Sequence, residues 1–286
     1  MPRLFRLSLL VMVVVVGVAG IVVALVLPGS DEEFGGRRLV WSDEFSESAL
    51  DRAKWTVVDR STLGDGNDEL ACLMDRPQNL NVSGGQLHLV ARKEPVPVRC
   101  GQDDSRFPGG REYTSAYLTT KGLANFTHGA FVMRARLPTA PGVSKGLWPA
   151  FWLRAAGGGP GELDVFEGIG SGPDEGEWNK VHQTVHFDYV PTYPKQTTAA
   201  VTPRGIPSDG MHTYAFVWEP DEIRWYIDGT LTYERSAKAV PWLGKILNQP
   251  YQLRINLAVG GKWPGDPGPA TAFPAGYDID FVRVYQ

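Results

Sequence analysis

The sequence has few cysteines and no excess of positive charge. Its 286 residues include two cysteines, and the formal net charge at pH 7 is −4. Proteins that bind nucleic acid or an anionic surface usually carry a basic patch. A negative net charge does not favour such a patch, so we expect no nucleic-acid partner. The chain also lacks a cluster of histidine and cysteine that would hold a catalytic zinc ion, and no glycine-rich phosphate loop follows a predicted strand.

Helical periodicity is missing from residue 31 onward, and so are internal repeats and a second domain boundary. Polar and apolar residues instead alternate along short segments, among them residues 86–91, 130–137, 213–218, 222–227, 251–258 and 279–285. Asp228-Gly229 follows one of these segments and is a strong hairpin signal. Together with 33 glycines and 22 prolines, this pattern predicts an all-β fold, an antiparallel sandwich or barrel.

The first thirty residues differ from the rest of the chain. Residues 7–27 are almost purely apolar, and two arginines precede them. As a helix this segment would span roughly 31 Å, about the hydrocarbon thickness of a bilayer, and it is longer than the apolar core of a secretory signal. We therefore expect residues 1–30 to be an uncleaved signal anchor rather than a cleaved signal peptide, with residues 31–37 as a polar linker. The arginines favour a cytoplasmic N-terminus, so the remainder would lie on the extracellular side, membrane-anchored or secreted.

The two cysteines, Cys72 and Cys100, are 28 positions apart. Outside the cytoplasm such a pair is expected to form a disulfide, which loop-entropy arithmetic values at about 3–4 kcal/mol. The alternative is two free thiols on strands that never meet.

Three acidic residues are concentrated in one short apolar segment: Glu162, Asp164 and Glu167. On a regular strand Glu162 and Asp164 share a face, whereas Glu167 would point to the other face. One inserted residue, a β-bulge, would return Glu167 to the face of the other two. Like charges this close raise at least one pKa, which costs stability but suits catalysis. The alternative is an acidic, solvated strand edge, although no Lys or Arg follows to pair the acids.

Glycoside hydrolysis is the reaction that fits such a group. A retaining enzyme needs an ionised carboxylate as nucleophile and a protonated carboxyl as acid, about 5–5.5 Å apart. The side chains of Glu162 and Glu167 would lean toward each other over Asp164, which could share a proton and modulate both pKa values. Upstream, Trp148 and Trp152 share a strand face and could stack on sugar rings, and the alternative is two core tryptophans.

These segments together resemble glycoside hydrolase family 16, in its laminarinase-like branch. The resemblance rests on Gly-Leu-Trp-Pro-Ala-Phe-Trp at 146–152, followed by Glu-Leu-Asp-Val-Phe-Glu at 162–167. Further segments match in the same order, at 39–45, 184–186, 209–214, 225–229, 256–265 and 280–285. The similarity covers residues 38–286, which we expect to be the catalytic domain.

The resemblance implies a β-jelly-roll sandwich of two curved antiparallel sheets with a concave substrate cleft, preceded here by one N-terminal hydrophobic helix. It implies Glu162 as the nucleophile, Asp164 as its helper and Glu167 as the acid/base. The positions that match the cleft lining are Trp148, Trp152, His186, Asn256 and Trp263. A lone histidine on an apolar strand is more often a packed core residue, and it is the family match that favours a cleft position for His186.

The family often binds a structural calcium ion on its convex face. The matching positions are Glu44, the carbonyl of Gly85 and Asp280, and the alternative is a surface salt bridge of Asp280. No cofactor is expected for the chemistry itself. Two departures from the family's pattern affect outer subsites: Ala116-Tyr117 replaces a glycine-arginine pair, and Leu-Ala-Cys at 70–72 replaces polar and aromatic residues.

We therefore predict a monomeric, retaining endo-glycosidase that hydrolyses β-1,3-glucans or mixed β-1,3/1,4-glucans. A wall-glycan transglycosylase would use the same covalent intermediate and pass the sugar to another glycan. A non-catalytic glucan-binding protein would be expected to have lost one or both glutamates, and this chain keeps both. Galactan-cleaving activities such as that of agarases stay open, because loops set substrate choice.

Overall fold

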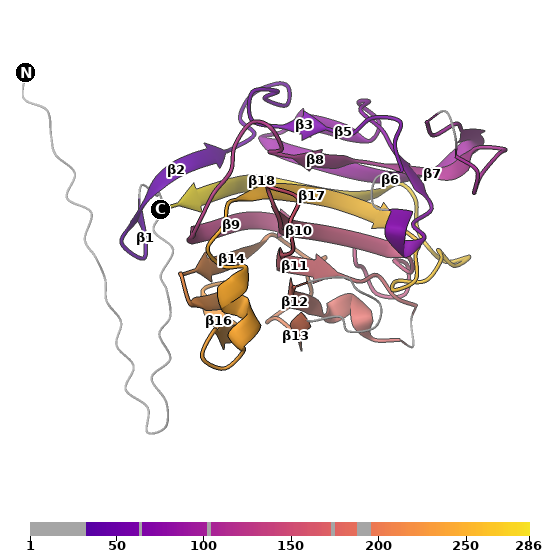
Figure 1. Ribbon diagram of the computed structural model, residues 1–286. Coiled ribbons are helices and arrows are strands. Elements are labelled where there is room, and N and C mark those ends of the chain that lie inside the picture. Colours follow the sequence, from indigo (N-terminus) through magenta and orange to yellow (C-terminus); the bar gives the residue numbers. More distant parts are fainter. Residues whose placement is uncertain (1–32, 63–64, 102–103, 173–174, 188–195) are drawn as a thin grey trace, which may run out of the picture.

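The computed structural model describes residues 33–62, 65–101, 104–172, 175–187 and 196–286, which form two β-sheets packed face to face (Figure 1). The larger sheet contains β1 (Glu33–Phe34), β2 (Arg37–Asp43), β4 (Ala71–Leu73), β5 (Leu80–Ser83), β6 (Gln86–Val98), β7 (Arg111–Ser115), β9 (Gly129–Arg136), β14 (His212–Trp218), β15 (Glu222–Ile227), β16 (Thr230–Ser236) and β18 (Ala275–Tyr285). The smaller sheet contains β3 (Thr56–Val57), β8 (Tyr117–Thr119), β10 (Leu147–Ala155), β11 (Glu162–Gly168), β12 (Val181–His186), β13 (Gln196–Val201) and β17 (Tyr251–Val259).

The larger sheet has the order β16-β15-β14-β9-β18-β6-β7-β4. Outside this order, β2 pairs with both β1 and β18, and β5 pairs with β6. The smaller sheet has the order β13-β12-β11-β10-β17-β8-β3. Neighbouring strands are antiparallel, apart from the short parallel pair β4 and β7. Three 3₁₀ turns connect strands, η1 (Asp65–Asn67), η2 (Glu177–Asn179) and η3 (Pro241–Lys245). The predicted all-β sandwich of two antiparallel sheets is confirmed.

The core lies between the sheets and follows from the alternation of apolar residues along the strands. On β10, Phe151 and Leu153 are fully buried, whereas Trp152 between them points to the opposite face. On β14, Phe216 and Trp218 fill the core from the larger sheet. Each such side chain contributes about 1.5–3 kcal/mol of hydrophobic stabilisation. The outer face of the smaller sheet is therefore left for function.

A hydrogen bond between the sheets holds the acidic strand in place. Trp225 on β15 is fully buried, and its Nε1 donates to the backbone carbonyl of Asp164 on β11 at 2.7 Å. Farther along the same chain segment, β15 turns into β16 at Asp228 and Gly229, both with positive φ (49° and 74°). The predicted hairpin at this pair is confirmed, because positive φ at both central residues matches the twist of the flanking strands.

The N-terminal end of the described chain differs from the sequence prediction. Phe34 on β1 is buried, and its ring lies 5.5 Å from that of Tyr285. The next two residues are glycines with positive φ, which turn the chain back into β2. Residues 33–37 are thus a small hairpin instead of part of a linker over 31–37, because a buried aromatic ring anchors them to the sheet.

The predicted N-terminal anchor, residues 1–30, lies outside the described residues. Within the described part of the chain, no helix is long and apolar enough to span a membrane. The N-terminal hydrophobic helix therefore stays a prediction.

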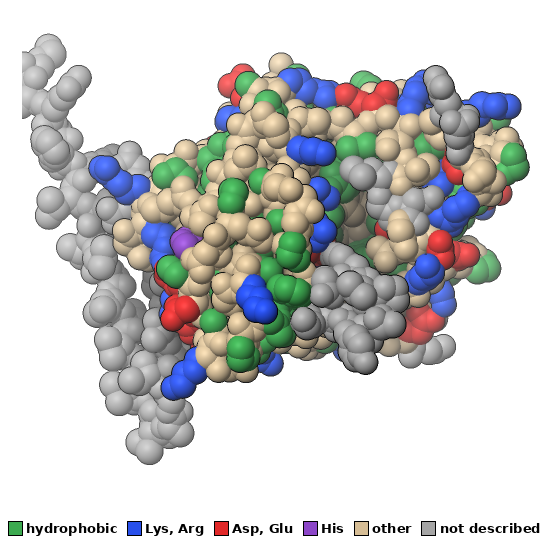
Figure 2. Space-filling view, in the orientation of Figure 1, with side chains coloured by type: hydrophobic (Ala, Val, Ile, Leu, Met, Phe, Trp, Pro, Cys, Tyr) green, Lys and Arg blue, Asp and Glu red, His purple; other side chains and the backbone are tan. Residues whose placement is uncertain are grey.

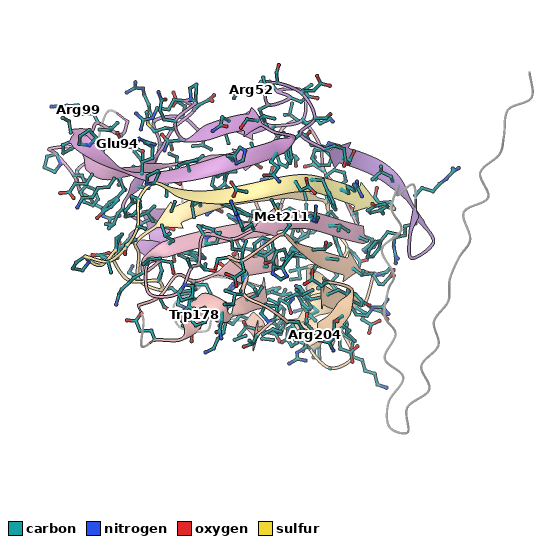
Figure 3. All side chains as sticks on the ribbon, turned by 180° about the vertical axis from the view of Figure 1, so that it is seen from behind. Arg52, Glu94, Arg99, Trp178, Arg204 and Met211 are labelled. Carbon is teal, nitrogen blue, oxygen red and sulfur yellow. A yellow bond between two sulfur atoms is a disulfide. The ribbon has the colours of Figure 1, made fainter. Side chains whose placement is uncertain are left out.

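The two cysteines form the expected disulfide. The Cα atoms of Cys72 and Cys100 are 5.5 Å apart, and both residues are buried. The bond fastens the segment after β6 to β4, whose neighbouring residues Ala71 and Leu73 face the cleft described below. Arg99, next to the bridge, lies at the opposite edge of the molecule from Trp178 (Figure 3).

Charged side chains of both signs are interspersed on the outer surface in the view of Figure 2. This distribution agrees with the small net charge of −4. It presents no broad basic face on that side for an extended polyanion.

Candidate active site

A β-bulge on β11 brings the three predicted acids to one face of the smaller sheet. Phe151 and Trp152 are consecutive on β10, but their partners on β11 are Phe166 and Asp164. Val165, between these partners, is therefore the extra residue. Both Val165 and Phe166 are fully buried in the core. The register against β12 shifts at the same place. The side chains of Glu162, Asp164 and Glu167 consequently face the same cleft.

The cleft covers the outer face of the smaller sheet and has a volume of about 790 Å³. Its floor comes from β10, β11, β12 and β17, and one wall comes from the segment that leads into β4. All of the predicted catalytic and substrate-binding residues line it: Trp148, Trp152, Glu162, Asp164, Glu167, His186, Asn256 and Trp263. The fold thus assembles residues that are spread over more than one hundred positions of the sequence.

Asp164 is the central and most buried acid, and His186 is its neighbour on β12. His186 Nε2 lies 3.3 Å from Asp164 Oδ2, and the ligand atoms of Glu162, Asp164 and His186 all lie within 4.8 Å of one another. Burial opposes the charging of His186, but its hydrogen bond to Asp164 and the negative charges of Asp164 and Glu162 outweigh burial and raise the pKa of His186. His186 therefore holds a proton to higher pH than an isolated imidazole, and that proton brings a positive charge next to Asp164.

The same three groups are close enough to bind a divalent cation, because two carboxylates and an imidazole are common metal ligands. They also include the predicted nucleophile and its helper. A metal at this position would occupy the carboxylate that is predicted to attack the sugar.

Glu167 has a different environment from Glu162. Burial raises the pKa of Glu167 well above its ordinary value, and the charges of Asp164 and Glu162 act in the same direction. The indole Nε1 of Trp148 donates a 3.0 Å hydrogen bond to Glu167 Oε1, which opposes the rise without cancelling it. Glu167 therefore keeps its proton to higher pH than an exposed glutamate, as a general acid requires.

The aromatic residues of the cleft fall into two arrangements. Trp148 meets Trp263 edge-on, with ring centroids 5.2 Å apart, and Trp263 is 45% exposed. Trp152 instead donates a 2.7 Å hydrogen bond to Asn256 Oδ1, and the guanidinium of Arg254 lies over its ring at 4.8 Å. The first pair offers an open aromatic surface to a sugar ring, while Trp152 is held by polar neighbours.

Two further residues lie on the cleft face and were not predicted. The alternation of side chains along a single strand could have identified both. His182 precedes Thr184 by two residues on β12, and its ring lies 4.8 Å from that of Trp263. Burial lowers the pKa of His182, and the nearby carboxylate of Glu177 only partly opposes this. Arg154 follows Trp152 by two residues on β10 and pairs with Glu162 in register.

Two more residues could not have been found in this way. Tyr117 on β8 lines the cleft, and Arg254 on β17 packs over Trp152. Tyr117 was identified only as a departure from the family's pattern. The two residues meet because β8 pairs with β17, and the segments that form these strands are far apart in the chain.

The two carboxylates predicted to bind calcium are engaged by arginines. Glu44 accepts two hydrogen bonds from Arg283, at 2.8 and 3.0 Å, and Asp280 accepts one from Arg134. Gly85 lies in the turn between β5 and β6, with φ of 75°. Calcium would have to displace both guanidinium groups, so the residues in this arrangement do not fit the ion, and the calcium site stays a prediction.

Comparison with known proteins gives a consistent result. The sequence model of the family 'Glycosyl hydrolases family 16' matches residues 67–283 of this chain. The chain is 39% identical over 265 residues to a beta-glucanase from Rhodothermus marinus, which covers 87% of this chain and 85% of that protein. It superposes on an endo-beta-1,3-glucanase from Pyrococcus furiosus with a TM-score of 0.73 and 33% identity, over 89% of this chain and 97% of that chain. For the laminarinase from Rhodothermus marinus the values are 0.70 and 36%, over 87% and 96%.

Proposed function

The chain belongs to glycosyl hydrolases family 16, and on that premise we propose that it is an endo-β-glucanase. It hydrolyses internal bonds of β-1,3-glucans or mixed β-1,3/1,4-glucans and retains the configuration of the cleaved bond. The relatives described above, a beta-glucanase, an endo-beta-1,3-glucanase and a laminarinase, support the substrate class. An open cleft along the sheet suits cleavage within a long chain.

The first chemical step forms a covalent intermediate. The carboxylate of Glu162 attacks the anomeric carbon, the glycosidic C–O bond breaks, and the leaving oxygen takes the proton of Glu167. In the second step Glu167, now ionised, removes a proton from water. The water oxygen attacks the same carbon and displaces Glu162, so two inversions give net retention.

The raised pKa of Glu167 supports this division of roles, because one carboxyl has to be protonated while its partner is ionised. When Glu167 gives up its proton, negative charge appears close to Asp164. His186 lies 3.3 Å from Asp164 and offsets part of that charge. Asp164 and His186 therefore act as positioning and charge-balancing residues for the two glutamates.

A single observation carries the proposal: the extra residue Val165 in β11, which turns Glu162, Asp164 and Glu167 to one side. A regular strand would place Glu167 in the core. A catalytic use accounts for Glu167, a partly buried carboxyl crowded by two other acids, which is costly to the fold.

The location of the enzyme is part of the proposal. The Cys72–Cys100 disulfide supports an oxidising compartment outside the cytoplasm. We assign residues 1–30 as the segment that directs the chain there, either as an anchor or as a cleaved signal, and residues 38–286 as a monomeric catalytic domain.

A substrate panel tests the activity. Laminarin, lichenan, xyloglucan and agarose are incubated with the protein and with Glu162→Gln, and the products are separated by size. We expect oligosaccharides of mixed length from laminarin or lichenan, and none from the variant. Longer products on addition of an acceptor oligosaccharide would show a transglycosylase instead. Inactivity on the whole panel would favour a glucan-binding protein.

Azide rescue tests the separate roles of the glutamates. With Glu162→Ala and an activated aryl glycoside, azide replaces the nucleophile and yields an α-glycosyl azide by one inversion. With Glu167→Ala, azide attacks the intermediate on Glu162 and yields the β-azide. The reverse pattern would exchange the two roles.

A further inference from the structure

His182 on β12 lines the cleft, but the proposed mechanism gives it no task. In the register of the two strands it lies directly opposite Glu167 on β11. Side chains in this relation share one face of the sheet, with Cβ atoms about 4.5–5.5 Å apart. The His182 side chain is 13% exposed. A largely buried histidine therefore lies next to the residue that donates the proton.

Aromatic contacts connect His182 with Glu167 by a second route. The ring of His182 meets that of Trp263 edge-on, with centroids 4.8 Å apart and planes at 75°. Trp263 meets Trp148 in the same manner, at 5.2 Å and 90°. The indole Nε1 of Trp148 in turn donates a 3.0 Å hydrogen bond to Glu167 Oε1. Trp263 is thus held between His182 and the tryptophan that contacts the acid/base.

Trp263 depends on these two neighbours for its position. It lies on the segment after β17 rather than on a strand, and its side chain is exposed. Gly260 and Gly261, both with positive φ (70° and 120°), lead the chain to it. Among the described residues, its ring contacts are those with His182 and Trp148. Because burial contributes little to holding such an indole, the edge contact with His182 fixes where the ring rests.

The indole of Trp148 influences which oxygen of Glu167 carries the proton. An indole N–H only donates, so the oxygen that faces it has to accept. The carbonyl oxygen of a protonated carboxyl accepts better than its hydroxyl, so the bond to Oε1 favours the proton on Oε2. General acid catalysis needs that proton at the leaving oxygen, and a small displacement of a positioned group lowers the rate.

His182 acts through its ring rather than through a charge. Its Nε2 lies 3.3 Å from Glu177 Oε2 but outside hydrogen-bond alignment, and Ala200, opposite on β13, has no charge. Lys180 donates to the other oxygen of Glu177 and offsets its charge. Burial lowers the pKa of His182, and Glu177 only partly opposes this, while Lys180 adds to it. A neutral ring suits the position, because a cation beside Glu167 would favour the ionised carboxylate and weaken the acid.

We propose that His182 is a positioning residue for the acid/base. Its ring holds Trp263 against Trp148, so that the Trp148 N–H stays on Glu167 Oε1 and the acidic proton stays on the other oxygen. The inference rests on the proposed function, because it concerns one step of the same reaction. That step is the departure of a leaving group that has to be protonated.

Two substrates that differ only in their leaving group test this role. Phenyl β-laminaritrioside needs a proton on its leaving oxygen, whereas 2,4-dinitrophenyl β-laminaritrioside releases a stable phenolate without one. We expect His182→Ala to lower kcat/KM about tenfold for the phenyl glycoside and less than about twofold for the dinitrophenyl glycoside. His182→Gln also lacks an aromatic ring, so the same selective loss is expected, and it serves if His182→Ala does not fold.

Two further variants separate the ring from its polar atoms and from a general effect of losing a histidine. His182→Phe keeps an aromatic edge for Trp263 and should retain at least about half of the wild-type kcat/KM on both glycosides. His212→Ala is the matched control, because His212 is also paired with a carboxylate, Asp228 at 2.7 Å, but on the larger sheet. It should leave both values unchanged.

Three results would overturn the positioning role. An equal fall on both glycosides in His182→Ala would assign the residue to substrate binding or to the fold. An unchanged kcat/KM for the phenyl glycoside would show that Trp148 keeps its place without His182. A selective loss in His182→Phe as large as in His182→Ala would assign the effect to the imidazole nitrogens. Failure of the wild-type enzyme to cleave laminarin and both glycosides would count against the proposed function itself, so the two failures are distinguishable.

Discussion

Carboxylates lie on both sheets of the sandwich, but the two sheets surround them with different partners. On the larger sheet Asp278 accepts hydrogen bonds from Arg136 and His88, and Glu44 is held by Arg283. In the cleft of the smaller sheet Asp164 faces His186, while Glu167 accepts a hydrogen bond from the indole N–H of Trp148 and lies near two further acids.

The difference separates structural from catalytic use of the same chemical group. A carboxylate paired with arginine stays ionised and contributes modest stability. A desolvated carboxyl among other acids has a raised pKa, as Glu167 has, and keeps its proton to higher pH, which suits a general acid. If the comparison is right, substitutions on the smaller sheet should change activity, and substitutions on the larger sheet should change only stability.

The largest effect should come from Glu162→Gln. The amide cannot attack the anomeric carbon, so we expect kcat on laminarin to fall at least about 10³-fold while binding of laminarihexaose persists. Steady-state kinetics and calorimetric titration measure the two quantities. Asp278→Asn is the matched control, since it makes the same change on the other sheet. Activity of Glu162→Gln close to that of the wild type would remove this residue as nucleophile.

The second substitution is Glu167→Gln, for which activity and stability should move in opposite directions. We expect kcat to fall about 10²–10⁴-fold for substrates with poor leaving groups. In the wild type, activity should decline as pH rises through the raised pKa of Glu167, because the acid form is lost.

The raised pKa of Glu167 also makes the stability of the fold depend on pH. Between the unfolded and folded pKa values of Glu167, the native state holds a proton that the unfolded chain has released. The free energy of unfolding therefore decreases as pH rises through this window. Glu167→Gln removes that decrease, so it should be more stable than wild type at neutral pH by about 0.5–2 kcal/mol and no more stable below the unfolded pKa. Urea unfolding at both pH values checks this, and a destabilised variant at neutral pH would contradict it.

The acidic strand could be predicted from the sequence, because the alternation of side chains and the requirements of the reaction point to the same residues. Alternation places Glu162 and Asp164 together, and the need for two facing carboxyls predicts a bulge before Glu167. The identity of the extra residue, Val165, requires the registers with β10 and β12, which depend on two other strands.

The contact between Tyr117 and Arg254 could not be predicted from the sequence for a related reason. Tyr117 and Arg254 belong to segments far apart in the chain, and only the pairing of β8 with β17 brings them together. Likewise, Phe34 turns a polar, glycine-rich segment into a hairpin because it packs on Tyr285 near the other end of the chain. Local patterns predict which elements form, whereas contacts between distant segments decide which polar residues share a site.

A smaller effect is expected for Asp278→Asn, which changes a buried carboxylate on the larger sheet. Asp278 is 6% exposed and accepts hydrogen bonds from Arg136 and from His88 Nδ1, the latter at 2.6 Å. Arg136 is about half exposed, so solvent screens its charge, and we expect a loss of about 1–2 kcal/mol in unfolding free energy. The kcat of the variant should equal that of wild type. A large loss of activity at unchanged folding would break the proposed division between the sheets.

The smallest effect should come from Glu44→Gln, which also tests the calcium prediction. The Glu44 side chain is 42% exposed and forms a bidentate pair with Arg283, so we expect a loss of at most about 1 kcal/mol that diminishes in high salt. Because Arg283 occupies the carboxylate, EDTA or added calcium should leave the melting temperature of the wild type unchanged. A rise in melting temperature with calcium that disappears in Glu44→Gln would instead show that the ion displaces the arginine. The larger sheet would then also bind a ligand through its carboxylates, and the two sheets would differ only in the kind of ligand that their carboxylates bind.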